Sequence, residues 1–286
     1  MISAFRVILE ASLSIRFLCL VIFIAVFLSR TPTCSADPIF SDPTKMAMAR
    51  AKPLLIAASA KHTATVIFLH GLGDTGFGWA SAVESWTRRS QLDEVKWVLP
   101  HAPRIPITAA EGMSLPGWFD VSALNGAVDD IRANQDEPGL LRTRDYVNTL
   151  IQAEIDAGIP ANRIVLGGFS QGGAMALLTG LTAKVKLAGI VGLSCWVPLD
   201  SKIPSLIQES NNNQDTPIFM AHGTVDQVVP TAFGKLSYEL LKKLNFPATM
   251  KLYPNMPHSA CDEELDEVEA FLHSRLPPQE EQKSEL

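Results

Sequence analysis

The chain has 286 residues, of which 47% are hydrophobic and 19% are charged. This composition suits one globular domain with a large buried core, and it excludes a chain that is disordered throughout. The formal net charge of −6 lacks the basic excess that nucleic-acid-binding proteins need, so we expect no nucleic-acid partner.

The N-terminal segment is predicted to be a targeting signal. Arg6 and Arg16 precede and border an apolar run over residues 17–28. This order is typical of secretory signals, so residues 1–36 are interpreted as a signal peptide or a signal anchor, with an organelle transit peptide as a further alternative. Residues 37–60 are expected to form a linker.

Localisation depends on which start is used. A full-length product is expected in the secretory pathway or outside the cell, and its N-terminal segment or acyl substrate could bring it to a membrane. A product that begins at Met46 or Met48 would keep the rest of the fold and is expected in the cytosol. The last four residues, 283–286, resemble an endoplasmic-reticulum retrieval signal, with Ser284 in place of the usual acidic residue.

Short apolar runs alternate with longer helical patterns over residues 61–276, the predicted catalytic domain. Six runs are short, aliphatic or β-branched, and bounded by Gly, Pro or polar residues, which predicts strands. They are residues 66–69, 95–99, 164–166, 187–193, 217–221 and 248–253. Helical spacing predicts helices near residues 140–155, 174–181, 231–244 and 262–276. The alternation predicts an α/β fold with a mainly parallel central sheet and helices on both faces.

Two long segments and a polar tail interrupt or follow this alternation. Residues 100–118 carry apolar side chains, so we expect a substrate wall with Leu115 and Trp118 among its contacts. Residues 122–138 are acidic and Asn-rich, and they are either a functional loop or a solvated insertion. Residues 277–286 are expected to form a mobile tail.

A candidate nucleophile lies between the third predicted strand and the helix that follows it. Residues 168–173 read Gly-Phe-Ser-Gln-Gly-Gly. A serine on a sharp strand-to-helix turn stands exposed above the sheet, and the flanking glycines avoid clashes with the neighbouring backbone. The alternative is an ordinary Gly-rich turn, but the strand and helix on either side favour Ser170 as a nucleophile.

A serine nucleophile needs an imidazole base and an acid, which follow it in the chain order Ser, acid, His. Among the histidines after the serine, His273 lies late in a helix and His222 precedes the candidate acid, so His258 is assigned as the base. Asp226 follows a predicted strand and is favoured as the acid over Asp200, which lies beyond a longer connection.

The oxyanion hole of such an enzyme uses two backbone N–H groups. Gln171 follows the nucleophile and is assigned the first. The Gly-rich segment 70–74 follows the first predicted strand, and Leu72 within it is assigned the second. His70 is expected to support this segment and not to act as a base.

No cofactor or metal is expected, because the sequence shows neither zinc-ligand spacing nor a Gly-rich phosphate loop with a following Lys. The chain contains 4 cysteines, too few for a disulfide framework once the two near the N-terminus are set aside. Cys195 is expected to be a small buried residue, and Cys261 could be oxidised if exposed.

Five ordered motifs resemble the acyl-protein thioesterase and carboxylesterase family of α/β hydrolases. The motifs are residues 68–76 (Phe-Leu-His-Gly-Leu-Gly-Asp-Thr-Gly), 117–120 (Gly-Trp-Phe-Asp), 167–173 (Gly-Gly-Phe-Ser-Gln-Gly-Gly), 193–196 (Leu-Ser-Cys-Trp) and 222–226 (His-Gly-Thr-Val-Asp). The resemblance covers about residues 65–272. It implies an α/β-hydrolase fold, the triad Ser170, Asp226 and His258, and the oxyanion donors Leu72 and Gln171.

Three functional hypotheses follow. The resemblance implies hydrolysis of fatty acyl thioesters on protein cysteines, with an acylated protein as substrate. The second hypothesis is a carboxylesterase or lysophospholipase that acts on small esters. The third is a ligand receptor on the same fold, which an intact triad disfavours because a binding protein needs no activated nucleophile.

Overall fold

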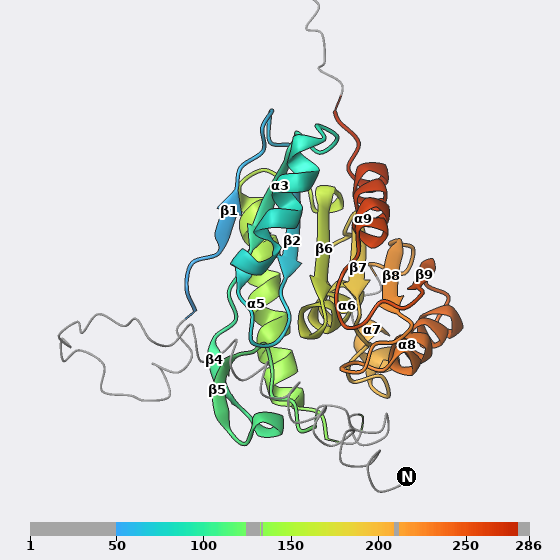
Figure 1. The fold of residues 1–286 in the computed structure, drawn as a ribbon. Helices are drawn as coiled ribbons and strands as arrows, with labels where there is room; N and C mark the ends of the chain where they lie inside the picture. The colour runs from blue at the N-terminus through green and yellow to red at the C-terminus, as the bar shows by residue number, and fades with distance from the viewer. Residues whose placement is uncertain (1–49, 124–131, 133, 209–211, 280–286) are drawn as a thin grey trace, which may run out of the picture. The chain divides into compact units, whose positions relative to one another are not determined.

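The computed structural model describes residues 50–123, 132, 134–208 and 212–279, all within one compact unit, Thr44–Leu286 (Figure 1). The predicted signal segment, most of the acidic insertion and the retrieval-like terminus lie outside the described residues. None of the described helices is both long and apolar enough to span a membrane.

A central sheet of seven strands has the order β1-β3-β2-β6-β7-β8-β9. Its strands are β1 (Leu54–Ile56), β2 (Ala64–Leu69), β3 (Val95–Leu99), β6 (Ile164–Phe169), β7 (Gly189–Leu193), β8 (Ile218–Gly223) and β9 (Ala248–Tyr253). Only β1 is antiparallel to its neighbour, and the other five pairings are parallel. The predicted fold class, an α/β hydrolase with a mainly parallel sheet, is therefore confirmed.

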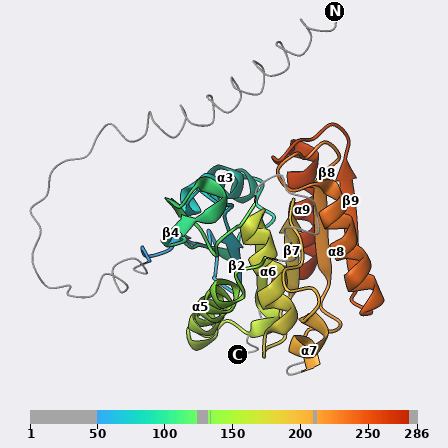
Figure 2. The ribbon, with the colours of Figure 1, turned by 90° about the horizontal axis from the view of Figure 1, so that it is seen from below.

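Two hydrophobic cores lie on the two faces of the sheet. Helices α5 (Glu137–Asp156), α6 (Gln171–Thr182), α7 (Ile203–Gln208) and α8 (Thr231–Lys243) contribute to one core. Helices α3 (Ala80–Arg88) and α9 (Asp262–Arg275) contribute to the other. Figure 2 shows α5 and α6 on the opposite side of the sheet from α3. Because helices cover both faces, the middle strands β2, β7 and β8 are buried along their whole length.

Helix α5 illustrates how local sequence signals set an element's ends and its buried face. Asp136 precedes the helix, and its carboxylate accepts a hydrogen bond from the Gly139 N–H at 2.9 Å. Leu140, Val147 and Ile151 recur at helical spacing and are buried. After the helix, Gly158 has a φ of +95°, a backbone conformation that favours glycine and ends the helical path.

The structure differs from the sequence prediction at the domain edges and in one loop. Residues 54–56, predicted as linker, form the edge strand β1, so the domain begins earlier than residue 61. The loop of residues 100–118 contains a hairpin of β4 (Arg104–Ile107) and β5 (Met113–Pro116). Strand β1 and the two strands of the hairpin are short. Strand β1 is stabilised by pairing with β3, a contact between distant parts of the sequence that local patterns do not reveal.

Helices α3 and α7 also lack a predicted counterpart, and the start of the tail is held in place. The Arg163 side chain donates a hydrogen bond to the Pro277 carbonyl at 2.7 Å, and the Gln279 N–H donates to the Glu94 carboxylate. The described part of the tail, residues 277–279, is therefore attached to the domain.

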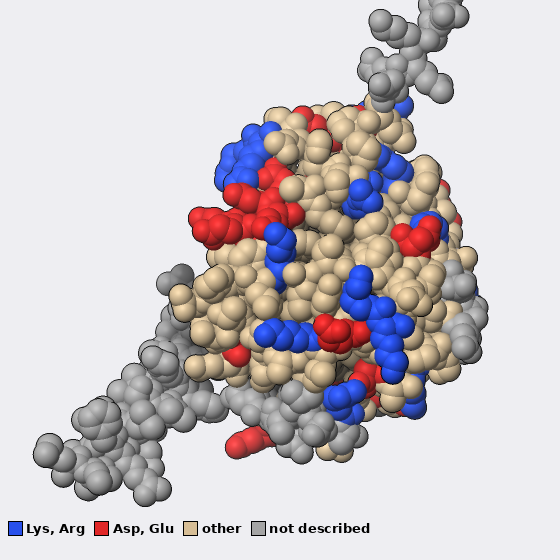
Figure 3. Space-filling model, turned by 90° about the vertical axis from the view of Figure 1, so that its right-hand side faces the viewer, with Lys and Arg blue, Asp and Glu red and all other residues tan. Residues whose placement is uncertain are grey.

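The β9 side of the domain presents a mixed-charge face. Figure 3 shows Lys and Arg scattered among Asp, Glu and uncharged residues, without a large area of one sign. On the open edge strand itself, Lys251 pairs with Glu267 of α9 at 3.3 Å. A charged lysine on an edge strand disfavours pairing with another chain.

Candidate active site

Ser170 lies on a sharp turn between β6 and α6. Its backbone has φ 55° and ψ −123°, a conformation that a residue with a side chain rarely adopts. A Cβ at Gly168 would lie 2.4 Å from the backbone of Gly172, and a Cβ at Gly172 would lie 2.2 Å from the Leu69 carbonyl oxygen. Both flanking positions therefore require glycine, as predicted, and the turn holds the serine above the end of the sheet.

Ser170, His258 and Asp226 meet at the carboxyl ends of β6, β9 and β8. The Ser170 hydroxyl lies 2.9 Å from His258 Nε2, and His258 Nδ1 lies 2.8 Å from Asp226 Oδ2. Ser170 is 8% exposed and Asp226 is 7% exposed. The three side chains predicted to act together are therefore within hydrogen-bonding distance, whereas the alternative acid Asp200 pairs with Arg132.

Several donors surround the Asp226 carboxylate. The N–H groups of Val228 and Val229 each donate to Oδ1 at 2.9 Å, and His222 Nε2 lies 3.3 Å from Oδ2. Burial by itself raises the pKa of Asp226, but hydrogen bonds from His222, His258 and the Val229 N–H outweigh it, so the pKa lies well below its usual range. The carboxylate therefore stays ionised and can orient the imidazole of His258.

His222 is a supporting residue whose role the sequence did not reveal. Its Nε2 also lies 2.8 Å from the Val229 carbonyl oxygen, which can only accept a hydrogen bond. The ring hydrogen must therefore be on Nε2, where it faces both Val229 and Asp226. The buried Nδ1 atom has no hydrogen-bond partner among the described residues, so no described group requires a hydrogen on it.

The backbone N–H groups of Leu72 and Gln171 are the candidate oxyanion donors. Among the described residues, we find no acceptor for the N–H of Leu72 or Gln171. Gln171 is the first residue of α6, so its N–H lies at the positive end of the helix dipole. A Cβ at Gly71 would lie 3.4 Å from Ser170 Cβ, which places the segment that contains Leu72 beside the serine.

The Gln171 side chain joins the turn to the segment after β5. Its Oε1 atom accepts a hydrogen bond from the Trp118 N–H at 2.8 Å, and its Nε2 atom donates to the Phe119 carbonyl at 2.6 Å. Both bonds are buried. The amide of Gln171 therefore fixes the residue whose own N–H is the candidate oxyanion donor, a contact that the motif did not predict.

His70 supports the opposite side of the site, as expected. It is fully buried, donates from Nδ1 to the Gly71 carbonyl at 2.7 Å, and accepts at Nε2 from the Ala102 N–H at 3.1 Å. The indole N–H of Trp118 donates to the His70 carbonyl at 2.8 Å. These bonds hold the segment of Leu72 against the segment of Trp118.

The two residues predicted to contact substrate lie in different settings. Trp118 is only 2% exposed and packs in the core, so its ring supports the site from behind and offers no surface to an acyl chain. The prediction of a substrate contact for Trp118 is therefore corrected. Leu115 is half-buried on β5, next to Pro116, whose carbonyl accepts the Gly73 N–H at 2.8 Å.

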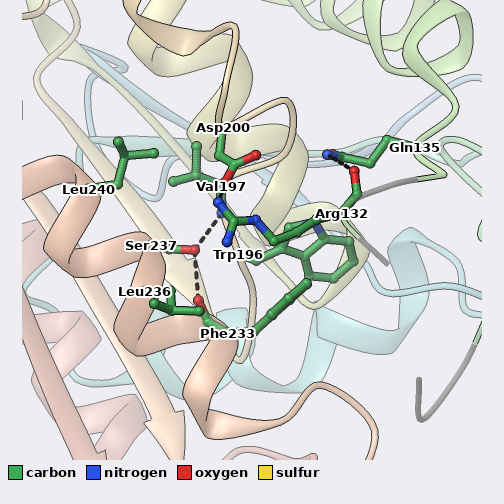
Figure 4. A pocket seen from close by; sticks show the side chains of 9 residues that line it. All are labelled: Arg132, Gln135, Trp196, Val197, Asp200, Phe233, Leu236, Ser237 and Leu240. Atoms are coloured by element: carbon green, nitrogen blue, oxygen red, sulfur yellow. Dashed lines mark hydrogen bonds and ion pairs between the residues drawn. The ribbon is translucent and has the colours of Figure 1, made fainter. Parts of the chain in front are cut away.

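A pocket lined by both apolar and polar side chains lies beyond the carboxyl ends of β7 and β8 (Figure 4). Its lining consists of Arg132, Gln135, Trp196, Val197, Asp200, Phe233, Leu236, Ser237 and Leu240. Trp196 contacts Phe119 edge-on, with ring centroids 6.1 Å apart, and Phe119 in turn accepts the hydrogen bond from Gln171. The pocket is thus connected to the Ser170 turn through one ring contact and one hydrogen bond to the Phe119 backbone.

The described residues contain no group of three or more His, Cys, Asp or Glu side chains that could hold a metal ion. Cys195 is fully buried and Cys261 is partly exposed, and neither forms a disulfide. The two described cysteines are therefore free thiols.

Comparisons with known proteins give a consistent result. A family model described as phospholipase/carboxylesterase matches residues 51–276. The chain is similar to acyl-protein thioesterase 1 of Neurospora crassa, with 57% identity over 242 residues that make up 84% of this chain and 99% of that protein.

Two solved structures share the fold over nearly their whole length. Arabidopsis thaliana SOBER1 has 32% identity and a TM-score of 0.68, covering 74% of this chain and 99% of that chain. Acyl-protein thioesterase 2 of Zea mays has 29% identity and a TM-score of 0.70, covering 79% of this chain and 99% of that chain.

Proposed function

This chain belongs to the phospholipase/carboxylesterase family, and we propose that within it the protein removes fatty acyl groups from protein cysteines as an acyl-protein thioesterase. The family membership establishes a serine hydrolase of esters or thioesters. The observation that most strongly supports the proposed catalytic residues is the unbroken chain of contacts from Asp226 through His258 to Ser170, at 2.8 and 2.9 Å.

In the proposed mechanism, Ser170 attacks the thioester carbonyl carbon while His258 Nε2 takes the hydroxyl proton. Asp226 stabilises the imidazolium that forms. The oxyanion accepts hydrogen bonds from the N–H groups of Leu72 and Gln171, which oppose the developing negative charge.

Collapse of the tetrahedral intermediate breaks the carbon–sulfur bond and forms the acyl-serine. The leaving cysteine sulfur receives the proton from His258. A water molecule then gives a proton to His258 and attacks the acyl carbon, and Ser170 leaves with that proton as the free fatty acid departs. Each turnover thus consumes one water and regenerates the enzyme.

We propose that the pocket of Figure 4 receives part of the acyl chain. Trp196 and Phe233 supply apolar walls, and their rings lie 5.9 Å apart. Leu236 is 47% exposed at the rim and would lose water contact when a chain enters. Leu236→Glu should therefore lower kcat/KM for palmitoyl substrates more than for acetyl substrates.

The primary test uses an active-site probe and a thioester substrate. A fluorophosphonate should label the wild-type protein and fail on Ser170→Ala, and steady hydrolysis of a palmitoyl-cysteine peptide should disappear with it. Ser205→Ala, an exposed serine on α7, is the matched control and should behave as wild type. Labelling without steady turnover would favour the ligand-receptor hypothesis instead.

A small-ester carboxylesterase or lysophospholipase is the second candidate, because the matched family model is described by both phospholipase and carboxylesterase activity. Rates on oxygen esters and thioesters of increasing chain length separate the two candidates. Rates that do not rise beyond short acyl chains would contradict the thioesterase proposal and support the carboxylesterase.

A further inference from the structure

A stack of one cation and three aromatic rings runs from the first described residue to the oxyanion segment. The Arg50 guanidinium lies 4.0 Å from the centroid of the Tyr146 ring. The Tyr146 ring stacks with Trp118, with centroids 6.5 Å apart and planes at 22°. Trp118 faces His70 at 5.0 Å. We call Arg50, Tyr146, Trp118 and His70 the aromatic stack.

The contact between Arg50 and Tyr146 accounts for the position of the guanidinium. Among the described residues, the buried Arg50 Nε atom has no hydrogen-bond partner, and no carboxylate forms an ion pair with the side chain. A guanidinium is weakly hydrated and stacks well on an aromatic face, so the ring supplies the attraction that hydrogen bonds do not.

The inner end of the stack is hydrogen-bonded to the segment that precedes Leu72 and to the side chain of Gln171. The Trp118 indole N–H donates to the carbonyl of His70, two residues before Leu72. The Trp118 backbone N–H donates to the side chain of Gln171. The Trp118 ring therefore contacts the segment of Leu72 directly, and the Trp118 backbone contacts the Gln171 side chain, so Trp118 links the two segments.

The geometry points to Arg50 as a positioning residue: by packing Tyr146 against Trp118, it keeps the two oxyanion N–H groups at the spacing that the reaction requires. This inference rests on the proposed function. Oxyanion stabilisation depends on donors placed in advance, and small displacements reduce the rate without removing the binding surface. The effect should therefore fall on kcat and leave KM nearly unchanged.

The test compares Arg50→Ala, Arg50→Lys and Lys52→Ala in the full chain with a palmitoyl-thioester substrate. Arg50→Ala should lower kcat about three- to tenfold, which corresponds to about 0.7–1.4 kcal/mol and lies within the range for a cation on an aromatic face, with KM within about twofold. Arg50→Lys keeps a cation and should recover part of the loss. Lys52 is an exposed cation two residues along and serves as the control.

A double-mutant cycle separates positioning from simple loss of stability. Tyr146→Leu should lower kcat by a similar factor, and Arg50→Ala combined with Tyr146→Leu should lower it no further. Thermal unfolding shows that each variant is folded at the assay temperature. Wild-type kcat in Arg50→Ala, or additive losses in the double variant, would overturn the inference. A wild-type protein with no hydrolase activity would instead refute the proposed function.

Discussion

Replacing Glu264 with glutamine should change how the stability of the protein depends on pH. Glu264 lies in the first turn of α9, is fully buried, and neither of its carboxylate oxygens has a hydrogen-bond partner among the described residues. Burial raises the pKa of Glu264 from 4.5 to about 8. The folded protein therefore holds this carboxyl group protonated at pH values where the unfolded chain releases the proton.

The direction and size of the effect follow from this pKa difference. Between about pH 4.5 and 8 the folded state binds more protons than the unfolded state, so the free energy of unfolding falls as pH rises. The loss levels off above pH 8. The pKa rises by about 3.5 units, and each unit corresponds to about 1.4 kcal/mol, so the free energy of unfolding falls by at most about 5 kcal/mol. Glutamine cannot ionise, so the free energy of unfolding of Glu264→Gln should not show this fall with pH.

The assay is chemical unfolding of the wild type and Glu264→Gln at pH 5 and pH 8.5. The stability of the variant relative to the wild type should increase by several kcal/mol between the two pH values, whatever its absolute value at pH 5. Glu263→Gln makes the same chemical change at an exposed position of the same helical turn and is the control. A constant difference between wild type and Glu264→Gln across this range would refute the reasoning.

Three further predictions concern the site and the N-terminal segment. Asp226→Asn should lower kcat by about 10³- to 10⁴-fold while leaving the fold intact, because the imidazole loses its orienting carboxylate; steady-state kinetics and circular dichroism check this. Gly172→Ala should destabilise the protein by more than about 2 kcal/mol in denaturant unfolding, because its Cβ would lie 2.2 Å from the Leu69 carbonyl oxygen. Full-length protein tagged just before Lys283 should be found in the secretory pathway, and a product that begins at Met46 in the cytosol; the same location for both would contradict the predicted signal.

Much of the fold could be predicted because its signals are local. Strands β3 and β9 have the predicted ends, since each is a short run rich in aliphatic or β-branched residues with Gly, Pro or polar residues on either side. Strand β1 could not be found in this way, because only three residues pair and their order depends on β3, more than 40 positions away. The hairpin likewise forms by pairing of two four-residue strands, β4 and β5, which are too short to give a clear local pattern.

The candidate site divides in the same manner. Chain order and position at strand ends were sufficient to select Ser170, Asp226 and His258, and the structure brings these side chains together. The amide contacts of Gln171 and the burial of the Trp118 ring depend on how distant segments pack. An apolar loop therefore indicated proximity to the site, but it could not indicate which side chains face the substrate.

The place of Arg50 in the chain restricts how this protein can be matured. Arg50 lies before β1 in the sequence and contacts Tyr146. Proteolysis that removed residue 50 would therefore leave the triad intact but remove the outer end of the aromatic stack. Cleavage after residue 36 and initiation at Met46 or Met48 both retain the arginine. These three forms should then have the same kcat. A protease that removed the chain up to and including residue 50 would lower kcat.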